Sequence, residues 1–290
     1  MLAERSHSYR TKAVILRRRN FGDADRILTV FTPRFGKRML IAKGSRKTTS
    51  RKAGHLEPFN HVNMLVAQAR TWDIITESVT IEGFLELRGD LDAISRAAYI
   101  CELVDAFTAE DDEYEVVWQL LLFCLRELDA GSTNEADLLV RWFELQLLRH
   151  MGFQPELFAC LGCGGDLLPV ENFMHLNAGG VFCPECGRNM QGGELISARI
   201  LKILRHLFRT HWDGLRGLRI RPSTARAVEG VLQRYLVTIL ERRLKSTDFI
   251  HRLRQTVADR ESVVKPEESA DAGSQSHGPR VSGNSSRRAD

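Results

Sequence analysis

The chain has 290 residues, which is long enough for two or three domains, and its 43% hydrophobic and 27% charged residues are ordinary for a globular protein. Its first ten residues lack the apolar stretch of a signal peptide, and no run approaches the roughly 18–20 apolar residues of a membrane span, so we expect a cytoplasmic protein without a membrane partner. The net charge of +4 hides three blocks: fifteen Lys and Arg against four acids in residues 1–60, seventeen acids against four Arg in 70–137, and fourteen cations against four acids in 199–254. This segregation favours basic surfaces for a polyanion beside an acidic body.

Residues 10–80 have the pattern of five short strands, which we expect at 12–18, 26–32, 37–42, 61–67 and 72–78. In the first of these, Val14 and Leu16 alternate with Ala13 and Ile15, as the two faces of a strand require. The connections at 20–23 and 33–36 resemble turns, whereas the basic stretch 43–54 has no periodicity and is expected to be a mobile loop. Five short strands without a long helix predict a small closed barrel as the first domain, residues 1–80.

Cations lie on and around the second and third predicted strands, and aromatic residues lie in the adjoining turns. This combination is typical of an OB-fold nucleic-acid platform, because phosphates need dispersed cations and unstacked bases need aromatic faces. Phe31 is expected in the core, while Phe21, Phe35 and Trp72 fit either the core or base stacking. The predicted DNA-binding residues are Arg19, Arg26, Arg34, Lys37, Arg38, Lys43, Arg46, Lys47, Arg51, Lys52, Arg70 and Trp72.

From about residue 81 the apolar period becomes helical, and helices are expected at 92–107, 116–128, 135–150, 198–211 and 224–245. Asp92, Asn134 and Ser197 are the expected N-terminal caps, and the nearly all-apolar helix 116–128 is expected at the centre of a bundle. Cys101 and Cys124 lie in these apolar patterns and are expected to be buried. We predict a helical domain over 81–258 and a disordered tail over 259–290, because residues 262–290 contain no Leu, Ile, Phe, Trp or Tyr.

Two Cys-x-x-Cys pairs, Cys160 with Cys163 and Cys183 with Cys186, are separated by nineteen residues. This spacing is typical of one tetrahedral zinc site in which each pair binds from a tight turn. Two unrelated pairs of reduced or disulfide-bonded cysteines are the alternative. The sequence therefore predicts a structural zinc ribbon of four cysteines, inserted in the helical domain over residues 156–195.

The sequence offers little that resembles a catalytic site. Asp23 and Asp25 are two apart and could bind a metal, but turn stabilisation is the favoured interpretation. His175 lies between the two cysteine pairs and could replace a thiolate, although four cysteines already complete the set. Four thiolates would also leave no open position for a substrate or water, so we expect no enzymatic activity.

The amino-terminal motifs resemble those of the RecO family of bacterial DNA-repair proteins, which mediate recombination. The matching segments are Phe21-Gly22-Asp23-Ala24-Asp25, Ala42-Lys43-Gly44 with Arg46-Lys47, and Leu56-Glu57-Pro58-Phe59, with the later cysteines. The similarity extends through the helical body to about residue 250. It implies a multidomain α+β protein: an N-terminal OB-fold β-barrel, then an α-helical bundle domain with an embedded zinc ribbon.

The resemblance also implies a function and partners. RecO-like proteins bind single- and double-stranded DNA, anneal complementary strands and, with RecR, help load RecA onto DNA coated by single-stranded-DNA-binding protein (SSB). They also contact the acidic carboxy-terminal tail of SSB. From charge and helix position we expect Arg141, Arg149 and Arg205 to edge an apolar notch for that tail. The alternatives from other classes are a zinc-dependent nuclease and a zinc-ribbon interaction protein with no DNA role.

Overall fold

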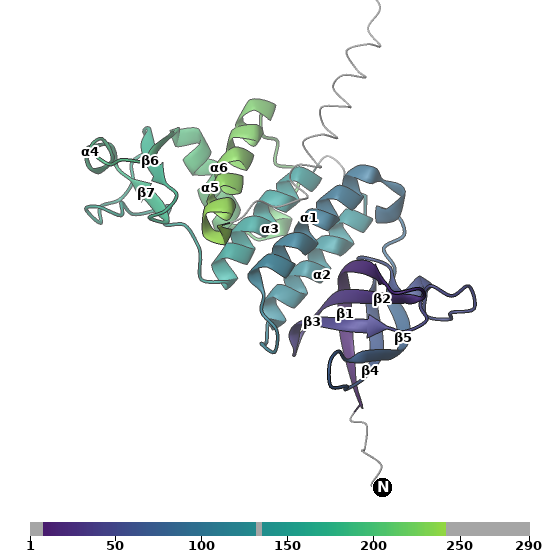
Figure 1. The fold of residues 1–290 in the computed structure, drawn as a ribbon. Coiled ribbons are helices and arrows are strands. Elements are labelled where there is room, and N and C mark those ends of the chain that lie inside the picture. The colour runs from purple at the N-terminus through teal and green to yellow at the C-terminus, as the bar shows by residue number, and fades with distance from the viewer. Residues whose placement is uncertain (1–7, 132–134, 242–290) are drawn as a thin grey trace, which may run out of the picture. The chain divides into compact units, whose positions relative to one another are not determined.

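The computed structural model describes residues 8–131 and 135–241, and Figure 1 shows their strands and helices. Five strands form a closed barrel: β1 (Ser8–Phe21), β2 (Asp25–Thr32), β3 (Gly36–Ala42), β4 (His61–Ala67) and β5 (Ile74–Glu82). The strand order is β1-β2-β3-β5-β4, and β1 pairs with β4 through its first half and with β2 through its second half. β3 closes on β5 in parallel, with Ile41 opposite Ile74. The predicted α+β class with an N-terminal OB-type barrel is confirmed.

The two faces of β1 face two different cores, as the alternation in the sequence predicts. Ala13 and Ile15 are buried inside the barrel, together with residues of the other strands such as Val30. Val14 and Leu16 point the other way and join the core of the helical domain. A β-bulge between Ile15 and Arg17 then shifts the register, so that Arg17 and the strand residues after it are exposed. Strand β1 therefore belongs to the barrel and to its contact with the helices.

Three helices follow the barrel: α1 (Leu91–Phe107), α2 (Glu115–Asp129) and α3 (Ala136–His150). The first is capped by Asp90, whose carboxylate accepts from the N–H of Asp92, so the prediction of Asp92 as the cap was wrong by one half-turn. The predicted cap Asn134 lies outside the described residues. Helix α3 ends as expected before Gly152, which has a φ of +79°.

The central helix of the bundle is α3, whereas the sequence predicted α2. Helix α3 packs against α1, α2, α5 and α6, while α2 packs against α1 and α3. The sequence was misleading because α3 buries Arg141, Glu144 and Gln146, and these residues lower its apparent hydrophobicity. Cys101 and Cys124 are buried in the same bundle core, as predicted.

A small sheet lies within the segment that contains the four cysteines. Its strands β6 (Asn172–His175), β7 (Gly180–Phe182) and β8 (Glu194–Ile196) form the order β7-β6-β8, and the one-turn helix α4 (Pro184–Gly187) follows β7. None of these elements was predicted from the sequence, because three or four residues carry no detectable period. Met174, Val181 and Ile196 of this sheet join the same core as the helices.

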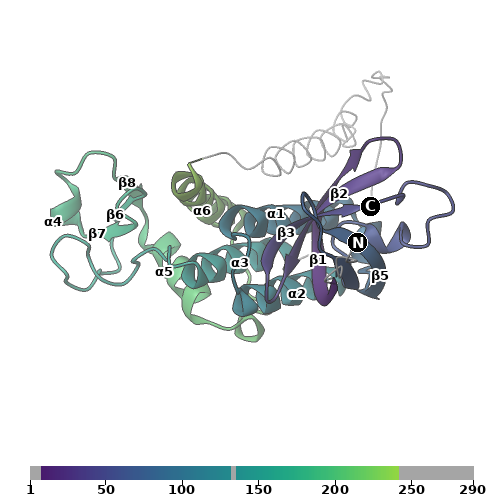
Figure 2. The same cartoon turned by 60° about the horizontal axis from the view of Figure 1, so that its bottom comes forward.

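Helices α5 (Ala198–Arg209) and α6 (Pro222–Leu240) pack against each other and against α3 (Figure 2). Ser197 caps α5 as predicted, with its hydroxyl accepting from the N–H of Ile200 at 3.4 Å. Three short 3₁₀ turns lie at Gly54–Leu56, Leu87–Gly89 and Trp212–Gly214. The predicted continuation of the last helix over 242–245 and the tail 259–290 lie outside the described residues. In the described ranges, no helix combines the length and the apolar character that a membrane span requires.

Candidate functional site

The four predicted zinc ligands lie together in the cysteine segment. The Sγ atoms of Cys160, Cys163, Cys183 and Cys186 are all within 4.8 Å of one another. Cys160 and Cys163 occupy a turn before β6, and the second pair brackets the start of α4. The side chain of His175 is engaged elsewhere, because its Nε2 lies 3.0 Å from the carbonyl of Gln191 and its Nδ1 accepts from the N–H of Ala178. The four thiols therefore form the donor set without a histidine.

The spacing of these thiols fits a tetrahedral metal ion. Bonds of about 2.3 Å from zinc to sulfur place two tetrahedral sulfurs about 3.8 Å apart. The Sγ atoms of Cys163 and Cys183 are 4.0 Å apart, far beyond the roughly 2.0 Å of a disulfide. Two glycines allow the close packing around the cysteines, because neither has a Cβ. A Cβ on Gly162 would lie 2.9 Å from Cys186, and a Cβ on Gly187 would lie 2.3 Å from the Phe173 ring.

Backbone groups prepare one of the four thiols for metal binding. Burial raises the pKa of the Cys160 thiol, but the N–H groups of Cys163, Cys183 and Gly162 outweigh it and lower that pKa to about 6. The pKa of Cys186 is instead raised to about 12, chiefly because its thiol hydrogen-bonds to Cys183. Four thiolates this close would repel one another, so a bound cation is what would stabilise them together. The group is suited to hold a metal ion.

The loops at one end of the barrel bring together a second candidate site. Phe21, at the end of β1, and Trp72, just before β5, meet edge to face with ring centroids 5.2 Å apart. Phe21 remains 41% exposed, so this pair presents an aromatic surface to solvent. Trp72 was predicted as the first residue of a strand but lies in the loop before it, because β5 begins at Ile74. We refer to Phe21 and Trp72 as the aromatic rim.

The basic loop between β3 and β4 is fixed against this rim. The guanidinium of Arg46 donates to the carbonyl of Gly22 at 3.0 Å, and its N–H donates to the carbonyl of Ala24 at 2.9 Å. Asp25 accepts from the N–H of Gly44 at 2.7 Å, which confirms a structural role for that carboxylate. The loop start was predicted to be mobile, but these contacts anchor it beside the turn that follows Phe21.

The predicted DNA-binding cations fall into two groups. Within the described part of the chain, one group has exposed side chains that form no ion pair: Arg19, Arg34, Lys43, Lys47 and Arg51. Arg70 is also exposed and lies in the loop that contains Trp72. Lys43 and Lys47 lie on the same loop as Arg46, which is hydrogen-bonded to Gly22 next to the aromatic rim. Within the described residues, the side chains of Arg19, Arg34, Lys43, Lys47 and Arg51 are therefore available to an external anion.

The other predicted cations are engaged within the protein. Arg26 lies 3.6 Å from Glu57, and Arg38 pairs with Asp73 at 3.0 Å and with Asp111. Lys52 donates to the carbonyl of Ile75 at 2.7 Å. Lys37 reaches Asp105 on α1, with its Nζ 3.3 Å from the carboxylate and 2.6 Å from the carbonyl. Lys37 therefore attaches the barrel to the helical body. Phe31 is fully buried against Tyr114 and Trp118, as predicted, and Phe35 packs on Tyr9.

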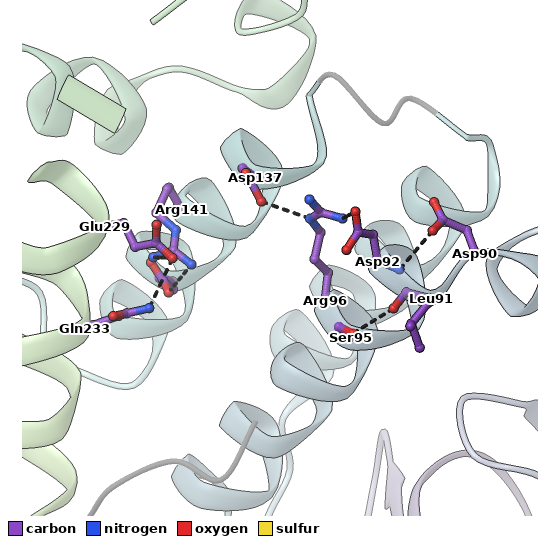
Figure 3. A network of polar contacts seen from close by, with 10 residues as sticks. Asp90, Leu91, Asp92, Ser95, Arg96, Asp137, Arg141, Glu229 and Gln233 are labelled. Carbon is purple, nitrogen blue, oxygen red and sulfur yellow. Dashed lines mark hydrogen bonds and ion pairs between the residues drawn. The ribbon is translucent and has the colours of Figure 1, made fainter. Parts of the chain in front are cut away.

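Arg141, predicted at the edge of an open notch, is buried in the bundle. Its guanidinium lies 3.0 Å from Glu144 on the same helix, 3.8 Å from Glu229 on α6 and above the ring of Tyr99. Figure 3 shows this cluster, where Gln233 donates to Glu229, beside the separate contacts of Arg96. Burial raises the pKa of Glu144 to about 7, against the opposing effects of Arg141 and the Tyr99 hydroxyl. The position of Arg141 does not suit an external ligand.

Arg149 and Arg205, in contrast, lie around one pair of aromatic rings. The guanidinium of Arg149 lies 5.5 Å from the ring of Phe208, and that of Arg205 lies 5.5 Å from the ring of Phe158. The two rings are 6.1 Å apart. Arg209, which the sequence reasoning did not select, lies 3.7 Å above Phe158. We refer to these five residues as the Arg–Phe patch; Phe158 lies fifty residues before Phe208, so no local pattern could have predicted it.

Comparison with known proteins gives matches over most of the chain. Residues 6–84 match the family described as Recombination protein O N terminal, and residues 88–248 match Recombination protein O C terminal. A DNA repair protein RecO from Roseiflexus sp. (strain RS-1) is 38% identical over 251 residues, covering 87% of this chain and 88% of that protein. DNA repair proteins RecO from Dehalococcoides mccartyi (strain ATCC BAA-2266 / KCTC 15142 / 195) and Desulforamulus reducens (strain ATCC BAA-1160 / DSM 100696 / MI-1) are 36% and 32% identical, covering 83% and 84% of this chain and 94% of each relative.

Proposed function

Because the chain belongs to the RecO family of DNA repair proteins, we propose that it is a recombination mediator that binds DNA and catalyses no covalent step. It would bind single- and double-stranded DNA without reading the sequence, and would anneal complementary strands. With RecR it would help RecA to load onto DNA coated by SSB. It would act in the cytoplasm on the nucleoid.

The observation that carries this proposal is the aromatic rim with the anchored basic loop beside it. Phe21 and Trp72 offer faces on which unstacked bases can lie, and each stacked base contributes about 1–3 kcal/mol. Lys43 and Lys47 offer charges for phosphates on the loop that Arg46 holds to Gly22. Both features are independent of base identity, because every base has an aromatic face and every nucleotide has a phosphate.

Annealing would follow from this same arrangement. Two complementary strands repel each other through their phosphates, and cations on a protein surface reduce that repulsion without any fuel. The exposed cations of the barrel that form no ion pair in the described residues are suited to this role. The protein would then promote pairing by neutralising charge and holding bases unstacked.

The four cysteines would bind one structural Zn²⁺, which would crosslink the turn before β6 to the start of α4. Arg205 on α5 donates to the carbonyls of Leu157 and Leu167, on either side of the first cysteine pair. The bound metal would therefore stabilise a segment that packs on the helices. A closed shell of four thiolates supports a structural role, because it leaves no position for a reacting group.

The Arg–Phe patch is the proposed contact for the acidic tail of SSB. Exposed guanidinium groups above aromatic rings suit a segment that combines carboxylates with apolar side chains. Reversing Arg149 and Arg209, which are both exposed, should abolish binding of a peptide of the SSB tail in a fluorescence anisotropy titration. Arg219→Glu with Arg226→Glu is the matched control because it also reverses two exposed charges, and equal affinity of the two proteins would contradict this assignment.

The test of the proposed function is strand annealing, measured with and without SSB. The variant Lys43→Ala with Lys47→Ala removes two exposed charges and leaves the anchoring residue Arg46 in place. We expect weaker DNA binding, uniform across sequences, and slower annealing. The control Lys12→Ala with Lys202→Ala removes the same charge from exposed lysines elsewhere. Equal annealing by both variants would refute the proposal.

A further inference from the structure

The connection between α1 and α2 lies along one edge of β3. It spans residues 108–114, which include four exposed acids and no Lys or Arg, and we refer to it as the acidic connector. The N–H of Lys37 donates to the carbonyl of Ala109 at 3.0 Å, and the N–H of Asp111 donates to the carbonyl of Phe35 at 3.2 Å. Strand β5 pairs only with the other end of β3, so the acidic connector covers the part of this edge where β3 begins.

Two backbone features bring the acidic connector close to the barrel. A Cβ on Gly36 would lie 2.6 Å from the carbonyl oxygen of Ala109 and 2.7 Å from that of Asp112, so a side chain at this position would force the two segments apart. Asp111 has a φ of +58°, a left-handed conformation that is uncommon for a residue with a side chain. In this conformation its carboxylate accepts a hydrogen bond from the guanidinium of Arg38. The unusual backbone conformation therefore occurs at the residue that contacts a cation of the barrel.

Acids from the helical domain contact two successive cations of β3. Nη1 of Arg38 donates to Asp111, while its Nη2 donates to Asp73, an acid of the barrel itself, at 3.0 Å. Nζ of Lys37 lies 3.3 Å from Asp105, in the last turn of α1. The side chains of successive strand residues point to opposite sides, so one short segment of the chain provides an acid on each side of β3. Both cations are among those that the sequence predicts to contact DNA.

The contact between Arg38 and Asp111 is one that an external anion can replace. The side chain of Asp111 is 72% exposed, whereas that of Asp73 is 11% exposed. An exposed ion pair contributes little to stability, because water solvates the separated charges well. A DNA phosphate offers the same kind of acceptor oxygen as a carboxylate, and a guanidinium binds either group through parallel N–H donors. A phosphate can therefore take the place of Asp111 while Asp73 keeps Arg38 in position.

We propose that the acidic connector is an autoinhibitory element of the barrel. Asp111 occupies the place of a DNA phosphate beside Arg38, so DNA must displace this carboxylate before it gains the contact with Arg38. This inference rests on the proposed DNA binding by the barrel, to which it adds a competitor within the same chain. Release of Asp111 from Arg38 raises the affinity of the barrel for DNA.

The experiment measures binding of a fluorescein-labelled single-stranded oligonucleotide of mixed sequence to the full chain by anisotropy, at about 0.1 M salt and then over a range of salt concentrations. Asp111→Asn removes the charge and suits the positive φ, because asparagine adopts the left-handed conformation more readily than most residues. Asp111→Gly is a second variant that tolerates the same φ. Glu113→Gln is the control, since it removes an exposed acid of the same connector that forms no ion pair within the described residues. Each variant is also made in the background Arg38→Gln, and circular dichroism establishes that the variants fold.

One additional phosphate contact adds about 0.7 to the salt slope, which corresponds to a gain in affinity of about fivefold at about 0.1 M salt. We expect this gain in both Asp111 variants, but not in Glu113→Gln and not in the background Arg38→Gln. Equal binding by the parent and the Asp111 variants overturns the proposal and leaves DNA binding by the barrel intact, whereas an absence of binding by all of these proteins refutes both. A gain that persists in the background Arg38→Gln, or that is equal in Glu113→Gln, would show a general effect of charge and would also overturn the proposal.

Discussion

Glu144 on α3 provides a quantitative test of how the bundle core tolerates charge. Its side chain has no exposed surface, and one carboxylate oxygen accepts from the Tyr99 hydroxyl at 2.6 Å while lying 3.0 Å from Arg141. The second oxygen is buried, and no partner for it occurs within the described residues. Burial disfavours the ionised carboxylate, whereas Arg141 and Tyr99 favour it. The raised pKa of Glu144, about 7, means that burial is the stronger effect.

The sign of the resulting pH dependence follows from the proton count. Between a pH near the ordinary pKa of 4.5 and a pH of about 7, the unfolded chain has lost this proton while the folded protein retains it. Raising the pH through this window therefore favours the unfolded state. A rise of this pKa from 4.5 to about 7 corresponds to roughly 3 kcal/mol of unfolding free energy, which is present below the window and lost above it. The substitution Glu144→Gln removes the titration and should remove this loss.

The assay is denaturant unfolding followed by tryptophan fluorescence, at about pH 5 and about pH 8. We expect the unfolding free energy of the wild type, relative to Glu144→Gln, to fall by about 2–3 kcal/mol between these two conditions. Glu113→Gln, an exposed acid, is the control and should show no such difference. A difference that stays constant with pH would refute the reasoning. A difference of the opposite sign would mean that Arg141 outweighs burial.

Three further predictions follow from local geometry. Gly36→Ala should lower the melting temperature more than Gly22→Ala. Both glycines have a positive φ, +56° and +53°, but only at Gly36 would the new Cβ lie 2.6 Å from a backbone oxygen. Equal losses in melting temperature would contradict this clash. Cys183→Ser should reduce bound zinc, measured by mass spectrometry, and destabilise the helical domain, whereas full zinc occupancy would exclude a four-thiolate site. Arg88→Leu should lower the unfolding free energy by about 3 kcal/mol, because three carbonyl or amide oxygens lose their donor. The control Arg10→Leu should lower it by less than about 1 kcal/mol, because only an exposed ion pair is lost.

The barrel could be predicted from the sequence because its information is local. Alternating faces, as in Ala13 to Leu16, predict a strand that separates two cores, and the predicted strand 61–67 has the observed ends of β4. Strand β5 was predicted two residues early, since Trp72 is apolar and β-forming but lies in the loop against Phe21. The ring of Trp72 packs on Phe21, and these two residues are too far apart in the chain for a short stretch of sequence to reveal the contact.

The small sheet of the cysteine segment illustrates the opposite case. The spacing of Cys160, Cys163, Cys183 and Cys186 predicts a metal site, because two tight turns suffice to bring the thiols together. The strands between them are three or four residues long and pair across the segment, for example Phe173 with Phe182. The alternation of apolar and polar residues that indicates a strand can be recognised only over a longer stretch than this. The ligands could be predicted, but the scaffold that carries them could not.

The sequence shows which residues are cations, but it does not show which of them are paired inside the protein and which are exposed. The number of exposed cations can be measured from the salt dependence of DNA binding. Lys37 and Lys47 belong to one basic block, yet Lys37 reaches Asp105, 68 residues away, while Lys47 is exposed on the basic loop. If all eleven predicted cations met phosphates of single-stranded DNA, the logarithm of affinity would fall with the logarithm of salt at a slope of about 8.

With only the five exposed cations that form no ion pair in the described residues, the slope is about 3.5. We expect the smaller value, because an internal ion pair or hydrogen bond must break before its cation can replace a counterion. A slope near 8 would show that pairs such as Lys37–Asp105 open when DNA binds, which would also loosen the attachment of the barrel to α1.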